Sequence, residues 1–122
     1  MMIMGALSPS LSQEVNQLHA DICSGLADPT RILLLYTLFE GPRTVNELTL
    51  EFGLPQSTIS RHLKTLRERG LVIATRKGQM VEYSLADERL IQALDLLREV
   101  LRDGVLRRAV VVQEAEQNQL SE

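Results

Sequence analysis

A run of side chains able to donate hydrogen bonds lies between residues 56 and 64. Within it, Ile59, Leu63 and Leu66 recur at intervals of four and three residues, the spacing of one face of an α-helix. At about 100° per residue, the opposite face carries Ser57, Arg61, Lys64 and Glu68. An apolar back with a mostly cationic front suits a helix that reads the major groove of DNA. Taken alone, the pattern favours an ordinary solvated amphipathic helix, so the neighbouring segments must decide.

Positive charge is concentrated around this helix. The 122-residue chain has 13 basic and 16 acidic side chains and a net charge of −3, which argues against a protein that coats nucleic acid generally. Residues 55–82, however, carry six basic and only two acidic side chains, whereas both flanking segments are net negative. This local excess indicates a nucleic-acid partner for the segment itself.

The elements beside this helix predict a winged helix-turn-helix. Thr44 and Glu47 have the spacing of a capping box, which predicts a short helix over 45–52, and Gly53 suits the turn after it. The next helix begins at Pro55, so the two form a helix-turn-helix. Residues 71–76 and 79–85 predict a β-hairpin that turns at Gly78, with a basic tip over 76–79 as the wing.

Three further helices are expected around this motif. Apolar residues at helical intervals predict one over about 11–25, and Asp28-Pro29 begins a nearly all-apolar helix that should be central. Asp87 caps a last helix, in which Gly104 allows a break. That helix has more apolar residues than one face can hold, and the simplest cover for the surplus is a second copy. The expected organisation is a frayed N-terminus over 1–10, one mainly α domain with a small β-hairpin over 11–112, and a polar tail over 113–122.

Several classes of protein are excluded by composition. No run approaches the roughly 20 apolar residues of a membrane span, and the N-terminal residues lack the pattern of a signal peptide, so we expect a cytoplasmic protein without a membrane partner. Cys23 is the only cysteine, which excludes an intrachain disulfide. No Ser/His/Asp set or glycine-rich phosphate loop is present, so we expect neither an enzyme nor a cofactor.

The order of elements resembles the winged helix-turn-helix of the ArsR (SmtB/ArsR) family of bacterial transcriptional repressors. The resemblance covers about residues 11–105. It is carried by Leu26-Ala27-Asp28-Pro29-Thr30-Arg31-Ile32, by the run from Gln56 to Arg67, and by Gly70-Leu71-Val72 with the basic hairpin after it. It implies a homodimer, built from the first and last helices, that places two recognition helices in successive major grooves of an imperfect palindrome in double-stranded DNA.

Residue by residue, the resemblance assigns DNA reading to the first half of the recognition helix: Gln56, Ser57, Thr58, Ser60, Arg61 and His62. Lys64 is a candidate phosphate contact, while Arg61 can pair with guanine and Gln56 with adenine. Wing residues Arg76, Lys77 and Gln79 are predicted to contact the minor groove or phosphates. For the helix residues the alternative is an ordinary solvated surface, and for the wing residues it is an exposed hairpin. For His62 the alternative is a place at the edge of the core, since it lies about 60° from the apolar stripe. Arg67 and Arg69 are equally suited to intramolecular ion pairs.

The ligand-binding motifs of the family are missing from the matching positions. Many members sense metals through a Cys-x-Cys in the first helix of the motif, where residues 46–51 have no thiol, and others through Asp and His on the last helix, where residues 86–122 contain no His. We therefore predict no metal site. Cys23 is expected to be a small buried side chain, with an oxidisable thiol that makes the repressor redox-responsive as the alternative. A winged-helix module for protein association is the other alternative function.

Overall fold

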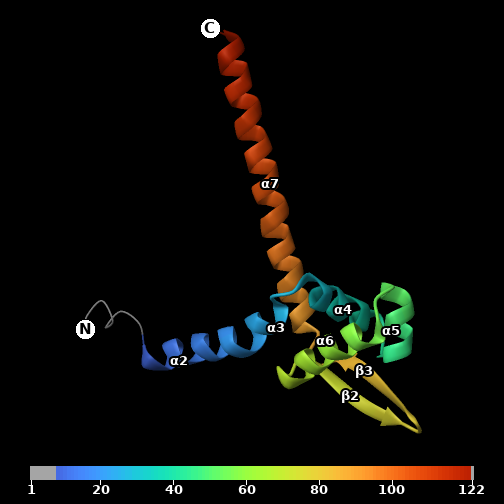
Figure 1. The fold of residues 1–122 in the computed structure, drawn as a ribbon. Coiled ribbons are helices and arrows are strands. Elements are labelled where there is room, and N and C mark those ends of the chain that lie inside the picture. The colour runs from blue at the N-terminus through green and yellow to red at the C-terminus, as the bar shows by residue number, and fades with distance from the viewer. Residues whose placement is uncertain (1–7, 122) are drawn as a thin grey trace. The chain divides into compact units, whose positions relative to one another are not determined.

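The structure is a computed structural model that describes residues 8–121, and it divides into two compact units, Met1–Glu88 and Arg89–Glu122. The elements of the first unit are α2 (Pro9–Leu18), a π-helical turn η1 (His19–Cys23), α3 (Ser24–Leu26), α4 (Pro29–Glu40), β1 (Arg43–Thr44), α5 (Val45–Phe52), α6 (Gln56–Glu68), β2 (Val72–Lys77) and β3 (Met80–Leu85) (Figure 1). The second unit is α7 (Arg89–Ser121). This order confirms the predicted fold class, mainly helical with a small antiparallel sheet.

The first helix starts earlier than predicted and contains an irregular turn. Its cap is Ser8, whose hydroxyl accepts a hydrogen bond from the backbone N–H of Leu11 at 3.1 Å, with Pro9 as the first helical residue. The helix therefore already includes residues 9 and 10, which were predicted to belong to a frayed N-terminus over 1–10, while residues 1–7 lie outside the described part. At His19–Cys23 the helix takes one π-helical turn before α3. The spacing of apolar residues does not predict such a turn, because a π-turn shifts the helical repeat by only one residue.

The core of the first unit is built of leucines from three helices. The carboxylate of Asp28 begins α4 as predicted, accepting from the N–H of Thr30 at 2.8 Å. The most completely buried side chains are Leu34, Leu35, Leu48, Ile59, Leu63 and Leu66. α4 is nevertheless buried on only one side, since Leu33 and Phe39 are about half exposed. The prediction that α4 lies at the centre of the domain is therefore correct for only one face of the helix.

The predicted hairpin is confirmed and gains a third strand. β2 and β3 pair antiparallel from Val72 opposite Leu85 to Lys77 opposite Met80, which leaves a two-residue turn. Gly78 in this turn has a φ of 63°, a conformation that favours glycine. β1 adds to the free edge of β3, giving the order β1-β3-β2. Two residues are too few to show an alternating pattern, so the sequence did not predict this strand.

α7 is one continuous helix from Arg89 to Ser121. The helix has no break at Gly104, where the sequence permits one, because the cost of about 1 kcal/mol for a helical glycine is local and the turns on both sides continue. The segment expected to be a polar tail from residue 113 is helical to Ser121, and its Gln, Glu and Ala residues are good helix formers. The domain boundaries themselves stay a prediction.

No single helix within residues 8–121 is both long and apolar enough to cross a membrane. Pro9–Leu26 and Pro29–Glu40 reach the required length and composition only as a pair bent by 85°.

Candidate nucleic-acid interface

α5 and α6 form a helix-turn-helix whose ends are fixed by specific hydrogen bonds. The Thr44 hydroxyl accepts from the N–H of Glu47 at 3.2 Å, and the Glu47 carboxylate accepts from the N–H of Thr44 at 3.0 Å, which is the predicted capping box. The hydrogen bonds from the backbone and side chain of Thr44 lower the pKa of Glu47 below its ordinary value, and the smaller effect of burial opposes them. Gly53 ends α5 with a φ of 64° and donates its N–H to the Thr49 carbonyl at 2.9 Å.

The apolar face of α6 anchors the helix in the core. Ile59, Leu63 and Leu66 are completely buried, and the helix contacts α4, α5 and β2. Because these three side chains are held from three directions, α6 has a fixed orientation within its unit. The polar residues on its other side are therefore presented to solvent together.

The structure brings most of the predicted reading residues onto that exposed side. Those that are exposed are Gln56, Ser57, Ser60, Arg61 and Lys64, and Thr58 is half-buried. Within residues 8–121, neither Arg61 nor Lys64 forms an ion pair. Their charges remain available to an anionic ligand, and phosphates and guanine edges are such ligands.

His62 does not belong to the exposed side. Its side chain is 7% exposed, and its Nδ1 lies 3.3 Å from an Nη atom of Arg31. A side chain buried to this extent presents little of its imidazole to a base edge, so the DNA contact of His62 stays a prediction that the structure does not favour. The turn of α6 that buries Leu63 and Leu66 also turns His62 inward. The alternative place at the edge of the core describes it better.

Arg31 has a structural role that was not predicted from the sequence. Its Nε donates to the Gly25 carbonyl at 2.8 Å and an Nη atom donates to the Ser24 carbonyl at 3.2 Å. Together with the contact to His62, these bonds join the end of α3 to α4 and α6. In the sequence, the only indication of this role is the position of Arg31 beside the helix cap in the segment 26–32.

The wing presents its polar side chains at the hairpin tip. Arg76, Lys77 and Gln79 are exposed, as predicted. The Lys77 ammonium lies 3.1 Å from a carboxylate oxygen of Glu82 on β3. Arg76 has no ion pair within the described residues. The two wing cations therefore differ in how freely they can turn to a phosphate.

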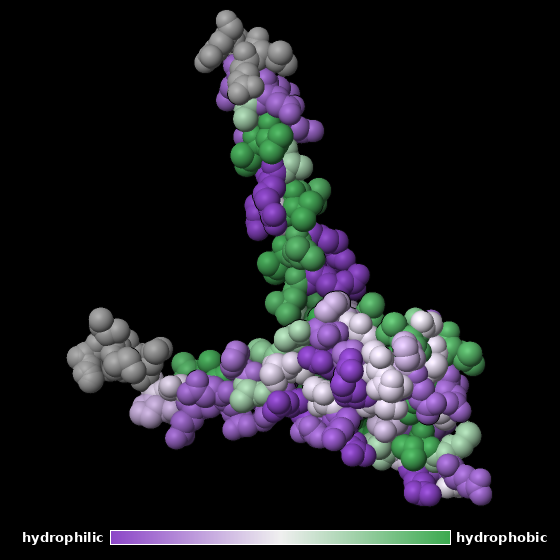
Figure 2. All heavy atoms as spheres, in the orientation of Figure 1, coloured by the Kyte–Doolittle hydropathy of each residue, from purple (hydrophilic) through white to green (hydrophobic). Residues whose placement is uncertain are grey.

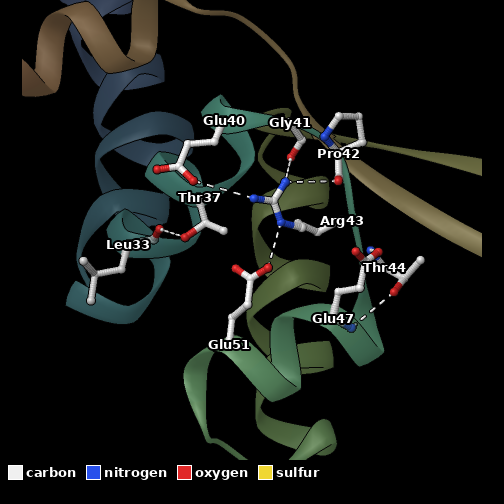
Figure 3. A network of polar contacts seen from close by, with 9 residues as sticks. All are labelled: Leu33, Thr37, Glu40, Gly41, Pro42, Arg43, Thr44, Glu47 and Glu51. Carbon is white, nitrogen blue, oxygen red and sulfur yellow. Dashed lines mark hydrogen bonds and ion pairs between the residues drawn. The ribbon is translucent and has the colours of Figure 1, made fainter.

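Arg43 joins the strand of the wing to the helix-turn-helix (Figure 3). Its Nε contacts a carboxylate oxygen of Glu51 on α5 at 2.8 Å, and its Nη atoms reach the Gly41 carbonyl at 2.7 Å and Glu40 at 3.6 Å. The hydrogen bond to Glu51 raises the pKa of Arg43 above its ordinary value. Since β1 pairs Arg43 with Tyr83 of β3, this one residue connects α4, α5 and the sheet. This role of Arg43 was not predicted from the sequence.

Cys23 is exposed, not buried as expected. It lies in the π-helical turn, whose side chains do not enter the core of the first unit. In the part of the chain that the structure describes, no group of three or more His, Cys, Asp or Glu side chains could hold a metal ion.

Comparison with known proteins identifies relatives for most of the chain. Residues 28–74 match the family described as "Bacterial regulatory protein, arsR family". The transcriptional regulator CmtR of Mycobacterium bovis is 45% identical over 76 residues, covering 62% of this chain and 64% of CmtR, slightly less than two thirds of that relative. The regulator NmtR of Mycobacterium tuberculosis is 39% identical over 88 residues, or 72% of each chain. These relatives are regulators rather than enzymes, in agreement with the sequence analysis.

A solved structure shows the same fold. It is the NMR structure of the winged helix-turn-helix DNA-binding domain Mb0332 from Mycobacterium bovis, described as homodimeric. The two chains superpose with a TM-score of 0.69 at 27% identity, covering 81% of this chain and 91% of the other.

Proposed function

Because the chain belongs to the ArsR family of bacterial regulatory proteins, whose members bind DNA, we propose that it is a cytoplasmic repressor that binds an imperfect palindrome in double-stranded DNA as a homodimer. The observation that carries the proposal is the exposed side of α6. There Arg61 and Lys64 lie opposite a fully buried apolar face and form no ion pair within residues 8–121.

Each polar residue of this surface has a role that fits its place. Arg61 donates two hydrogen bonds to O6 and N7 of a guanine, and Gln56 at the start of α6 pairs with adenine. Ser57, Thr58 and Ser60 bind neighbouring bases or phosphates, and Lys64 neutralises a phosphate. His62 acts from behind, by fixing α6 to Arg31 rather than by touching DNA.

The wing extends the contact to the next stretch of backbone. Arg76, Lys77 and Gln79 sit at the hairpin tip, and there they bind phosphates or enter the minor groove. Arg43 supports this arrangement by linking the sheet to α5.

Two copies are needed to read a palindrome. α2 exposes Leu11, Val15 and Leu18 on one side, and α7 exposes large apolar residues along its length. Surfaces of this kind favour association with a second copy. The homodimer described for Mb0332 supports the same assembly.

The signal that releases the repressor is not a metal held by the motifs of the family. Residues 46–51 have no thiol and residues 86–122 have no His, so soft and borderline metal ions lack their preferred ligands. The exposure of Cys23 favours the second candidate, a repressor that responds to oxidation of this thiol.

The proposal is tested by selecting binding sites for the purified protein from random double-stranded DNA. We expect an enriched palindromic sequence, bound with an affinity that falls steeply as salt is raised. Absence of any enriched sequence and of salt-dependent binding would overturn the proposal. Binding of a protein partner that is unaffected by Arg61→Ala would instead support the protein-association module.

A further inference from the structure

The contact between Arg31 and His62 places a titratable group behind the exposed face of the recognition helix. His62 lies in the middle of α6 and is 7% exposed, between the exposed Arg61 and the fully buried Leu63. Its Nδ1 lies 3.3 Å from an Nη atom of Arg31 on α4. Because a guanidinium N–H can only donate, Nδ1 accepts this hydrogen bond and the neutral ring carries its proton on Nε2. The bond therefore exists only while Nδ1 carries no proton.

Arg31 is fixed in its place by the backbone at the end of the first helical segment. Its Nε donates to the Gly25 carbonyl at 2.8 Å, and an Nη atom donates to the Ser24 carbonyl at 3.2 Å. Gly25 is buried, and a Cβ at its position would lie only 2.7 Å from Cδ1 of Leu71, just after α6. The backbone that holds Arg31 thus has little room to move. If the contact opens, His62 is the side that must give way.

The charged groups that act on His62 come from α4 and from α6 itself. Within residues 8–121 they are Asp28 and Arg31 at the start of α4 and Arg61 on α6, and no charged side chain of α5 or β2, which also contact α6, is among them. Burial lowers the pKa of His62; the Asp28 carboxylate opposes this shift, and the two arginines add to it. Asp28 is occupied as a helix cap, because it accepts from the N–H groups of Thr30 and Arg31. A charged imidazole would therefore meet two cations and one carboxylate that is already bonded.

We propose that binding of a proton to Nδ1 of His62 releases α6 from Arg31, so that the protein loses affinity for its DNA as the pH falls. The second ring proton, taken from solvent, turns the acceptor into a donor that faces another donor, and sets two positive charges 3.3 Å apart. Since Arg31 is held by backbone carbonyls, the imidazolium turns outward. Figure 2 shows that hydrophilic residues dominate the surface of the first unit around α6, so the charge reaches a polar surface. This movement disturbs α6 beside Arg61, the proposed base-reading residue.

The inference rests on the proposed function, because it concerns the affinity for DNA, and it adds a signal that needs neither a metal nor a thiol. Linkage fixes its sign: if the proton weakens DNA binding, DNA must weaken proton binding by the same factor. A phosphate near His62 would act in the opposite direction, because a negative charge favours the imidazolium. The direction of the shift on DNA therefore separates release of the helix from simple attraction by phosphates.

DNA affinity as a function of pH is the first measurement. The chain has two histidines, so His62→Gln and His19→Gln together assign any histidine-dependent effect. Glutamine supplies an oxygen that can accept from Arg31, but it binds no proton. Affinity for the selected site is measured by fluorescence anisotropy at fixed salt between pH 7.5 and 5.5. Relative to His62→Gln, the unaltered chain and His19→Gln should lose affinity by about three- to tenfold, since one proton contributes at most about tenfold for each pH unit below the ordinary pKa of about 6.5. An equal pH dependence in all three proteins overturns the inference.

The titration of the imidazole ring by NMR is the second measurement. The ring signals of His62 are those missing from His62→Gln, and they are followed against pH without DNA and with saturating DNA. We expect the titration of His62 to move to lower pH on DNA. An unchanged titration, or a move to higher pH, overturns the inference. Because this shift is read in the folded protein, it decides the question even if acid unfolding prevents affinity measurements at pH 5.5.

The two measurements also keep the inference apart from the proposed function. Absence of binding to any DNA at pH 7.5 would overturn the proposed function and the inference with it. Binding at pH 7.5 without a pH dependence that requires His62 would overturn the inference alone.

Discussion

An Nη atom of Arg31 lies 3.3 Å from Nδ1 of His62, so a residue from the start of α4 holds the recognition helix from behind. An arginine N–H can only donate, which makes Nδ1 the acceptor and leaves the proton of the neutral ring on Nε2. Burial lowers the pKa of His62 below its ordinary value; the Asp28 carboxylate opposes this shift, and the charge of Arg31 adds to it. Protonation of Nδ1 would remove the acceptor and set two cations side by side.

The first prediction concerns pH and stability. Because the folded protein binds a proton at His62 less readily than the unfolded chain, stability is complete above the ordinary histidine pKa of about 6.5 and is lost as pH falls below it. Urea denaturation at pH 7.5 and 5.5 should show a lower midpoint at the acid pH. His62→Gln should reduce this difference, whereas His19→Gln, at an exposed position, should leave it unchanged. An equal effect of both substitutions would contradict the role of His62.

The second prediction concerns base reading by Arg61. Arg61→Ala should weaken binding to the selected DNA site by about 5- to 150-fold and relax the preference at one base pair. Arg67→Ala, on the same helix and also exposed, is the matched control and should change affinity little. Fluorescence anisotropy at one fixed salt concentration measures both. Equal losses for the two variants would mean that charge alone, rather than a specific contact, drives binding.

The wing gives a third prediction, based on its ion pair. Lys77 is already held by Glu82 at 3.1 Å, whereas Arg76 is free to contact a phosphate. Arg76→Gln should therefore lower the slope of log affinity against log salt by about one, and Lys77→Gln by less. Glu82→Gln should strengthen binding by releasing Lys77. A larger effect of Lys77→Gln than of Arg76→Gln would show that the ion pair opens on the DNA.

A fourth prediction tests Arg43 as the joint between the sheet and α5. Arg43→Met removes the contacts to Glu51, Glu40 and the Gly41 carbonyl together, so it should lower the thermal unfolding midpoint and weaken DNA binding. Glu40→Gln removes only the exposed partner at 3.6 Å and should have a much smaller effect. Equal unfolding midpoints for the two variants would contradict the role of Arg43 in linking the sheet to α5.

A fifth prediction separates the two candidate signals. Zinc ions should leave the DNA affinity of the protein unchanged, since the ligands of the family motifs are missing. Treatment with hydrogen peroxide should lower affinity only if Cys23 is the sensor, and Cys23→Ser should then abolish the response. Loss of binding with zinc alone would reject the metal-free proposal, and an equal peroxide response in Cys23→Ser would reject the redox candidate.

The elements that the sequence predicted well are those with local signals. The capping box of Thr44 and Glu47, the cap at Asp28 and the turn at Gly78 depend on residues next to one another, and each was found where expected. The exposed face of α6 also follows directly from helical spacing.

Contacts between distant residues left no such signal. The pairing of β1 with β3, the bonds of Arg43 and the contact between Arg31 and His62 join residues up to 40 positions apart, as Arg43 and Tyr83 are. Helical spacing placed His62 near the boundary of the apolar stripe, and only the packing of α4 against α6 decided that it turns inward. The prediction that Cys23 is buried was wrong for a similar reason, because the exposure of a small side chain depends on which face of its turn packs against the rest of the chain.

The π-helical turn at His19–Cys23 sets the direction in which the side chains of Pro9–Leu18 point around the helix axis. An α-helix advances by about 100° per residue, and a π-turn inserts one extra residue into that advance. The buried residue Gly25 lies after this turn. Relative to it, the apolar side of Pro9–Leu18 is rotated by about the angle of one residue, compared with a helix that has no π-turn. Shortening the turn by one residue would redirect Leu11, Val15 and Leu18 by roughly a quarter of a circle without altering any of them. A single-codon deletion at this turn would thus act as a change of partner surface rather than as a loss of side chains.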